Sequence, residues 1–364
     1  MKILAIVSGL DFENHTRRST LEAIHKLNPE TDILLYNSVR NLFVPKKKIE
    51  GIKIYEYHFW ILENLRKFRF LQMLEYSLRR LRWKSYFSMY KFIFIIDPNQ
   101  YYLLPYLNNS HKIIYLLRDP SVLQNPSNYN SELCIIKRAN AILAISENLK
   151  SLYFYKHYGY QPENVFLWSN AVDLDLWDNS KFFYAGDASK PVVGMAGNIN
   201  QNTDLQLIKF LLVQRPDIRF EIAGKLKLNQ ERMQLWQELL EFKNLFYHGY
   251  IPFEELPGIV SQWDAGLLLE SKENEYSYYY NHNKIYQYMA LGKPFVSYKY
   301  NNVLQRFSNV AFTSDSPAEF LYMLDRALER SRLSDTKLIG LSYAKENSAK
   351  IREKEFLEII KSLS

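Results

Sequence analysis

Short apolar runs alternate along the chain with helically spaced apolar residues, and both halves show the pattern. Buried β-strands are predicted at 2–7, 32–36, 52–57, 92–96, 112–117, 141–145 and 164–167, and again at 191–197, 219–223, 245–247, 265–269 and 295–298. Helices are predicted at 16–27, 61–90, 131–139, 147–157, 204–214, 229–241, 253–261, 283–291, 316–331 and 344–362. Such alternation is typical of α/β domains with parallel sheets.

Two domains in tandem fit both the length of the chain and its pattern. The 364 residues, 47% of them hydrophobic, supply enough apolar material for two cores of ordinary size. Periodicity is lost over residues 174–190, where Asp, Ser and Gly gather, so we expect the linker there.

The stretch 263–300 carries the clearest functional signal. A buried strand is followed by a polar, tyrosine-rich loop, a helix beginning near Asn283, a Gly-Lys-Pro break and a second strand. This order places a loop and a helix amino end at the carboxyl edge of a parallel sheet, where α/β sheets bind ligands. Free backbone N–H groups there suit an anion, and a phosphate is the first expectation.

Two further strand ends in the second half supply similar chemistry. Gly197-Asn198 and Gly224-Lys225 each follow a predicted strand directly. Glycine permits close backbone approach, and a lysine just beyond a strand can hold a diphosphate as a point charge. Each pair alone is equally compatible with a plain turn, but together with the 270–287 segment they predict one phosphate-binding edge.

Charge is concentrated in the first half. The net charge is +7, and between Arg40 and Lys91 there are thirteen Lys or Arg residues against four Glu and no Asp. Nucleic acid, anionic lipid and a phosphorylated substrate all suit such a surface, as does a solvated basic face without a partner. The helical spacing over 61–90 gives one apolar and one basic stripe, which indicates either a helical hairpin on a membrane surface or a helix covering the sheet.

Other sequence features narrow the setting. Cys134 is the one cysteine, expected to be a small core residue, so no internal disulfide is possible and a cytoplasmic location is expected. The apolar N-terminal run is a first strand and not a signal peptide, and no run is long enough to span a bilayer. Asp173 and Asp175 have the Asp-x-Asp spacing of metal sites, but a cap and linker explain them, so we expect no metal.

Several segments together resemble the donor half of bacterial family-4-type glycosyltransferases with the GT-B fold. They are Val193-Gly-Met-Ala-Gly-Asn198, Phe220-Glu-Ile-Ala-Gly-Lys225, His248-Gly-Tyr-Ile-Pro252 and Asn283-Lys-Ile-Tyr-Gln-Tyr-Met-Ala-Leu-Gly-Lys-Pro-Phe-Val296. In the first half, the segments 139–146 and 169–173 are similar to landmarks of the same family. The likeness covers most of residues 110–300 and is thin over 1–100.

The resemblance implies two Rossmann-like domains facing a cleft. It divides the chain into an acceptor-side domain (1–175), a donor-binding domain (176–343) and a C-terminal helix (344–364) that packs back on the first domain. The implied activity is transfer of a sugar from a UDP-, GDP- or dTDP-linked donor, without a cofactor and with retained configuration, to a glycan or lipid-linked saccharide of the bacterial surface. The enzyme is expected in the cytoplasm, with the 61–90 stripe as a possible peripheral contact to anionic lipid on the inner face of the plasma membrane and no nucleic acid as partner.

The resemblance also assigns donor residues. Lys225 and Lys284 neutralise the diphosphate, and Gly197 and Asn198 face the donor phosphates. The turn at Tyr250-Ile251 meets the base. The remaining donor-side candidates lie in the tyrosine-rich loop and the helix after it: His282, Asn283 and Gln287.

The first half offers the candidates for catalysis and for the acceptor. Asp11, His15, Arg118 and Asp119 lie just after predicted strands. We expect His15 and Asp119 to be catalytic, because a histidine or a carboxylate can move a proton, and Asp11 and Arg118 to bind the acceptor. The tyrosines at 276, 278, 279 and 280 either stack on a base or sugar or pack between the domains.

Two departures from the family pattern leave alternatives open. Relatives usually carry glutamate at the position of Gln287, and many carry another at the position of Tyr279. Glutamine still hydrogen-bonds a hydroxyl, but without charge. A sugar-nucleotide epimerase of similar shape and a non-catalytic subunit of a glycan-assembly complex are therefore the alternative functions.

Overall fold

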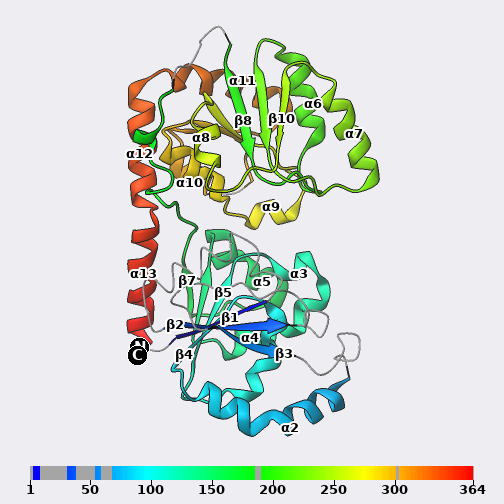
Figure 1. Cartoon of the computed structure of the whole chain (residues 1–364), viewed down its shortest axis with the longest axis vertical. Helices are drawn as coiled ribbons and strands as arrows, with labels where there is room; N and C mark the ends of the chain where they lie inside the picture. Colours follow the sequence, from blue (N-terminus) through cyan, green and yellow to red (C-terminus); the bar gives the residue numbers. More distant parts are fainter. Residues whose placement is uncertain are drawn as a thin grey trace. The chain divides into compact units, whose positions relative to one another are not determined.

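A computed structural model describes residues 3–8, 31–37, 54–58, 68–184, 190–300 and 303–363 (Figure 1). The chain divides into two compact units. The first comprises Met1–Ile145, Leu149–Trp168 and Glu353–Ser364, and the second comprises Ser146–Asn148 and Ser169–Arg352. Each unit is a parallel sheet packed with helices, which confirms the predicted pair of Rossmann-like α/β domains.

The first unit is built on a seven-stranded parallel sheet in the order β3-β2-β1-β4-β5-β6-β7. Its strands are β1 (Ile3–Ser8), β2 (Thr31–Asn37), β3 (Ile54–His58), β4 (Phe92–Ile95), β5 (Lys112–Leu117), β6 (Ala141–Ala144) and β7 (Val165–Leu167). All seven were predicted from the sequence. Strands β4 and β6 are buried at every position, which explains why they are continuous apolar runs and not alternating ones.

Helices of different lengths connect these strands. They are α2 (Arg69–Phe87), α3 (Ser121–Gln124), α4 (Tyr129–Arg138) and α5 (Phe154–Tyr158), with 3₁₀ helices at Pro98–Tyr106 and Pro126–Asn128 and a π-helix at Leu149–Tyr153. The predicted helix at 147–157 is thus a π-helical segment followed by an α-helix. The predicted helix at 16–27 lies outside the described residues.

The helical spacing at 61–90 predicted either a hairpin or a helix covering the sheet, and within the described part of that range it forms the single helix α2. Residues 61–67 lie outside the description. Across 68–184, 190–300 and 303–363, and the three short strands before them, no helix is long and apolar enough to cross a membrane.

Helix α4 buries a carboxylate and exposes the cysteine, the reverse of the expectation for Cys134. Glu132 is fully buried with Ile135 and Ile136, three and four positions on. Four hydroxyl groups donate hydrogen bonds of 2.5 to 2.8 Å to its carboxylate, those of Tyr115, Ser121, Tyr153 and Tyr158. These donors offset the cost of burying the charge.

The second unit is built on a six-stranded parallel sheet in the order β10-β9-β8-β11-β12-β13. Its strands are β8 (Val192–Ala196), β9 (Arg219–Ala223), β10 (Leu245–Gly249), β11 (Ala265–Leu268), β12 (Phe295–Tyr298) and β13 (Ala311–Ser314). The edge strand β13 was not predicted, because Ala-Phe-Thr-Ser has no strong apolar pattern.

The helices of the second unit surround this sheet. They are α6 (Leu205–Gln214), α7 (Gln230–Leu240), α8 (Leu256–Val260), α9 (Glu275–Tyr279), α10 (Asn283–Ala290), α11 (Pro317–Ser331), α12 (Ser334–Glu346) and the start of α13 (Ala349–Ser362), with 3₁₀ helices at Asn179–Lys181 and Leu304–Phe307. The loop predicted at 270–282 therefore contains one short helix, α9.

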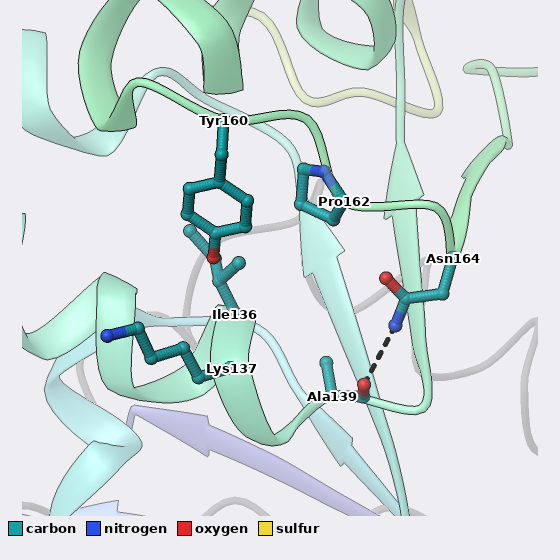
Figure 2. Close-up of a pocket in the computed structure, with 6 residues that line it drawn as sticks. All are labelled: Ile136, Lys137, Ala139, Tyr160, Pro162 and Asn164. Carbon is teal, nitrogen blue, oxygen red and sulfur yellow. Dashed lines mark hydrogen bonds between the residues drawn. The ribbon is translucent and has the colours of Figure 1, made fainter.

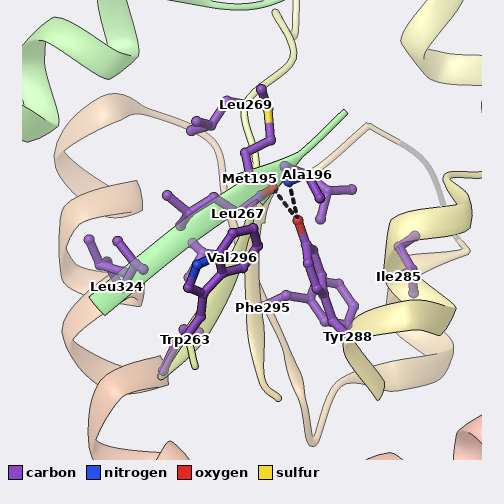
Figure 3. Packing of buried hydrophobic residues seen from close by; sticks show 14 of the residues in the cluster. Met195, Ala196, Trp263, Leu267, Leu269, Ile285, Tyr288, Phe295, Val296 and Leu324 are labelled. Carbon is purple, nitrogen blue, oxygen red and sulfur yellow. Dashed lines mark hydrogen bonds between the residues drawn. The ribbon is translucent and has the colours of Figure 1, made fainter. Parts of the chain in front are cut away.

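The core of the second unit fixes α10 against the middle of the sheet. Figure 3 shows Tyr288 of α10 pointing inward among Trp263, Phe295 and other buried side chains. The Tyr288 hydroxyl donates to the Leu267 carbonyl at 3.2 Å and accepts from the Ala196 N–H at 3.5 Å. These bonds tie the helix to β11 and β8, so its amino end is held in place by the core.

The C-terminal helix passes from the second unit back to the first, as predicted. The expected helix at 344–362 is interrupted at Asn347 and Ser348, between α12 and α13. Ser348 forms an isolated parallel β-bridge with Val172, and the Val172 N–H donates to the Asn347 carbonyl at 3.2 Å. Val172, Asn347 and Ser348 therefore all belong to the second unit, which includes Ser169–Arg352. Further along α13, the Phe356 ring packs against Phe94 and Trp168 of the first unit.

Candidate functional site

The sheet order of the second unit creates one natural binding edge. Strand β8 lies between β9 and β11, so the connections on its two sides run in opposite directions. In parallel sheets a ligand binds at the carboxyl ends of the strands where this reversal occurs. Gly197-Asn198, Gly224-Lys225 and Leu269-Glu270 follow β8, β9 and β11 at this edge.

Glycine is required at two of these strand ends. Gly197 and Gly224 have φ values of +151° and +159°. A Cβ atom on Gly224 would lie 1.9 Å from the Gly197 carbonyl oxygen, and one on Gly197 would lie 2.9 Å from Lys284 Cε. The two loops therefore pack backbone against backbone.

The side chain of Lys284 lies against the backbone of Gly197. Its Nζ atom lies 3.2 Å from the position that a Cβ atom on Gly197 would take. Lys284 is the second residue of α10, where Asn283 and the rest of the first turn present backbone N–H groups without partners inside the helix. The ammonium and the positive end of the helix dipole act on the same small volume.

A carboxylate that the sequence argument did not single out also faces this volume. Glu270 follows β11, and its Oε1 atom lies 3.7 Å from Lys284 Nζ while its Oε2 atom lies 3.2 Å from His282 Nε2. The Tyr300 hydroxyl accepts a hydrogen bond from the Glu270 N–H at 2.9 Å, which holds the backbone at this point. No local motif marks Glu270, because its neighbours come from a loop that returns twelve residues later.

His282 is buried and neutral at physiological pH. Its side chain is 3% exposed, and burial lowers its pKa to about 4, with the nearby charge of Lys284 acting in the same direction and Glu270 opposing it. Although Glu270 is close, the Nε2 atom has no partner with hydrogen-bond geometry among the described residues. A buried imidazole of this kind beside a lysine suits a polar ligand group.

Lys225 and Tyr250 meet at the ends of β9 and β10. The Lys225 ammonium lies 4.2 Å from the centroid of the Tyr250 ring, a cation–π contact between two exposed side chains. Ile251 follows in the same turn and is half-buried. These predicted donor residues therefore share the sheet edge with Gly197 and Lys284.

Gln287 lies on the same side of α10 as Lys284, three residues on, and is 9% exposed. Tyr279, the other position at which the sequence departs from the family that it resembles, is fully buried beside Tyr278. At these two positions the site holds neutral groups, and the carboxylate closest to Lys284 is that of Glu270.

Three polar side chains far away in the sequence fasten the loop that leads into α10. The Ser146 hydroxyl donates to the Tyr279 carbonyl at 2.7 Å, and the Asn148 amide donates to the Tyr278 carbonyl at 2.9 Å. The Asn170 amide donates to the Asn281 carbonyl. No local motif around Ser146 and Asn148 indicates this contact, because the loop lies 133 and 130 residues further along the chain.

The acceptor-side candidates occupy the first unit or lie outside the description. Arg118 and Asp119 directly follow β5, at the carboxyl edge of the central part of the first sheet. Asp11 and His15 lie outside the described residues. The side chain of Asp173 accepts from the N–H of Asp175 at 2.9 Å, which is the turn geometry expected of a linker.

A separate pocket of about 440 Å³ opens in the first unit, at the edge of the sheet where the strands begin (Figure 2). It lies near the amino ends of β6 and β7, between the end of α4 and the segment 160–164. Its lining is mostly apolar, and the Asn164 amide donates to the Ala139 carbonyl at 2.8 Å. None of the predicted site residues lines it.

Solved structures similar to the chain cover its whole length. Sucrose-phosphate synthase from Thermosynechococcus elongatus has a TM-score of 0.75 at 12% identity, with 100% of this chain and 99% of that chain covered. HepE from Anabaena, solved with UDP and glucose, has a TM-score of 0.69 at 14% identity, with both chains covered to 100%. A glycosyltransferase from Rickettsia africae has a TM-score of 0.73 at 12% identity, with 100% and 98% covered.

No protein-family model matches the sequence, and no curated protein matches it either. At identities of 12 to 14%, the structural likeness shows the fold. The chain has the GT-B fold of glycosyltransferases, as the sequence motifs predicted.

Proposed function

We propose that the chain is a glycosyltransferase that moves a hexosyl or deoxyhexosyl group from a nucleoside-diphosphate sugar to a saccharide acceptor. The observation that carries this proposal is the position of the Lys284 ammonium against Gly197 at the amino end of α10. A diphosphate is the ligand whose charge and shape suit an ammonium, a helix amino end and a bare glycine backbone together.

The donor residues then act on the leaving group. Lys284 and Lys225 neutralise the diphosphate, whose negative charge grows as the bond to the sugar breaks. Gly197 and Asn198 let the phosphates approach the backbone, and the Tyr250-Ile251 turn contacts the base. With two lysines and a helix amino end in place, we propose that the transfer needs no metal and no cofactor.

His282, Asn283 and Gln287 complete the donor side of the proposal. Neutral His282 donates or accepts a hydrogen bond without adding charge beside Lys284, since its pKa is about 4. Gln287 offers an amide to a ribose hydroxyl. Glu270 adds the carboxylate that Gln287 lacks, next to the same lysine.

The acceptor side is proposed from the sequence. His15 and Asp119 are the candidates for proton transfer at the acceptor hydroxyl, and Asp11 and Arg118 for its binding. We propose a glycan or lipid-linked saccharide of a bacterial surface polysaccharide as acceptor, at the cytoplasmic face of the plasma membrane, with retention of configuration.

A non-catalytic subunit is the second candidate. The neutral side chains at Gln287 and Tyr279 favour it, because the glycosyltransferases that the sequence resembles usually carry glutamate at the first position and many carry it at the second. Such a protein keeps the fold but binds the donor weakly.

Calorimetry of the full chain with UDP, GDP and dTDP distinguishes an active glycosyltransferase from a non-catalytic subunit. We expect one nucleotide to bind more tightly than the other two by tenfold or more, and the matching nucleotide sugar to be slowly hydrolysed. The nucleotide that wins names the donor class. Failure of all three to bind would overturn the enzyme proposal, and binding without hydrolysis or transfer would favour the non-catalytic subunit.

A further inference from the structure

Helix α2 exposes its apolar face. Five large side chains lie on one side of the helix at the spacing of a single helical face, and each is more than half exposed: Phe70 at 66%, Met73 at 69%, Leu74 at 56%, Leu78 at 67% and Leu81 at 81%. Helix α2 borders the first unit, where Figure 1 labels it. We call these five residues the outer face of α2.

The opposite side of α2 packs against the first unit through the buried rings of Trp83 and Phe87, and it also buries one ion pair. Glu75 and Arg79 form an ion pair of 2.7 Å there, with side chains 7% and 10% exposed. The Arg79 guanidinium also lies 5.5 Å from the centroid of the buried Trp83 ring. A helix that only covers a sheet turns its apolar side inward and its charges to water. Helix α2 therefore has two apolar sides, an aromatic one that is buried and the outer face that is exposed.

The borders of the outer face are basic. Arg80 and Lys84 lie four residues apart on one side, and Arg82 lies on the other side at 100° per residue. All three are exposed, and the one acidic residue in α2, Glu75, is on the buried side in its ion pair. An apolar stripe with basic borders and no exposed acid complements an anionic lipid surface.

Charge argues against a second copy of the chain as the occupant. A symmetric dimer through the outer face sets Arg80, Arg82 and Lys84 of one copy against the same basic borders of the other. Like charges across an interface cost affinity, and the exposed part of α2 has no carboxylate to pair with them.

We propose that α2 binds an anionic membrane, with its outer face in the boundary between headgroups and acyl chains and Arg80, Arg82 and Lys84 at the lipid phosphates. This proposal stands on α2 alone and does not require the proposed transfer reaction. It gives the protein a membrane contact made by a helix in the plane of the surface and not by one that spans it.

Vesicle flotation of the full chain tests the proposal. Vesicles of phosphatidylcholine with about a third phosphatidylglycerol should carry the protein upward, while vesicles of phosphatidylcholine alone should carry at least tenfold less. Binding should weaken at 0.5 M salt because the basic borders contribute to it. Equal binding to both vesicles, or binding to neither, would overturn the proposal.

Paired variants assign the effect to the outer face. Leu78→Glu combined with Leu81→Glu should reduce flotation at least tenfold. The matched control is Leu338→Glu, a leucine 66% exposed on α12 of the second unit, which should leave flotation unchanged. Thermal melting of the same samples reports whether each variant is folded, and nucleotide calorimetry separates this proposal from the enzyme proposal. Unchanged flotation in a folded double variant would refute the role of α2.

Discussion

The Glu270 carboxylate lies 3.7 Å from the Lys284 ammonium, at the place where the proposed diphosphate would bind. Both side chains are 16% exposed, so solvent screens the pair only in part. Glu270 therefore competes with a bound phosphate for the same lysine. The proposed diphosphate would meet a lysine whose charge Glu270 already balances in part, so the carboxylate should weaken the attraction of Lys284 for an anion.

We predict that Glu270→Gln binds the preferred nucleoside diphosphate about three- to tenfold more tightly than the unmodified protein. Removing one nearby negative charge reduces the repulsion of the phosphates, and a tenfold change corresponds to about 1.4 kcal/mol. Calorimetry at low ionic strength measures the change most clearly.

Glu273→Gln is the matched control, because it makes the same change of charge three residues further on at an exposed position. Its nucleotide affinity should differ from that of the unmodified protein by less than twofold. Weaker nucleotide binding by Glu270→Gln would show instead that the carboxylate is needed to hold Lys284 in its binding position.

We predict that Lys284→Ala lowers nucleotide affinity about 10- to 150-fold, the loss expected when a hydrogen bond to a charged group worth about 1.5–3 kcal/mol is removed. Lys293→Ala is the comparison, because Lys293 precedes β12 and lies at the opposite edge of the sheet, with its ammonium 3.8 Å from the Tyr184 ring centroid. Its affinity should fall by less than threefold, with melting curves confirming that both variants are folded. Equal losses would mean that the phosphates do not bind at Lys284.

The strand ends of the second unit could be predicted from the sequence because their signals are local. Each is a short buried apolar run followed by glycine or a polar residue, as at Gly197 and Gly224. Parallel topology then brings these ends to one edge without further information. The start of α10 at Asn283 was predicted on the same grounds.

The contacts that depend on distant residues could not be predicted. The inward position of Glu132 requires four hydroxyl donors, of which Tyr115 and Tyr158 lie 17 and 26 residues away. Without them, the apolar neighbours of Cys134 favoured the cysteine as the buried residue. The roles of Ser146 and Glu270 likewise arise from loops that meet only in the folded chain.

We predict that Gly224→Ala destabilises the second unit by about 3 kcal/mol and abolishes nucleotide binding. The added Cβ meets the carbonyl oxygen of Gly197 at 1.9 Å, and backbone cannot yield as a side chain can. Gly249→Ala, whose φ is +72° and whose Cβ would meet no atom within 4 Å, should cost only about 1 kcal/mol. Thermal melting measures both, and equal shifts would contradict the close packing of the two glycine loops.

Burial of His282 makes the stability of the second unit depend on pH. Its pKa is about 4 in the folded protein, below the value of 6.5 for an exposed histidine. Between these values the unfolded chain binds a proton that the folded chain does not, so the stability from this group is complete above pH 6.5 and is lost as the pH falls toward 4.

We predict that lowering the pH from 7.5 to 5 costs the protein about 2 kcal/mol through His282, since each pH unit between the two pKa values is worth about 1.4 kcal/mol. His282→Gln has no proton to gain and should lose about 2 kcal/mol less over the same range. Because the other histidines and carboxylates are common to both proteins, their contributions cancel in the difference. Thermal melting at pH 7.5 and pH 5 should therefore show a fall in melting temperature that is about 4–8 °C larger for the unmodified protein. Parallel falls in the two proteins would mean that His282 is protonated, or exposed, in the folded state.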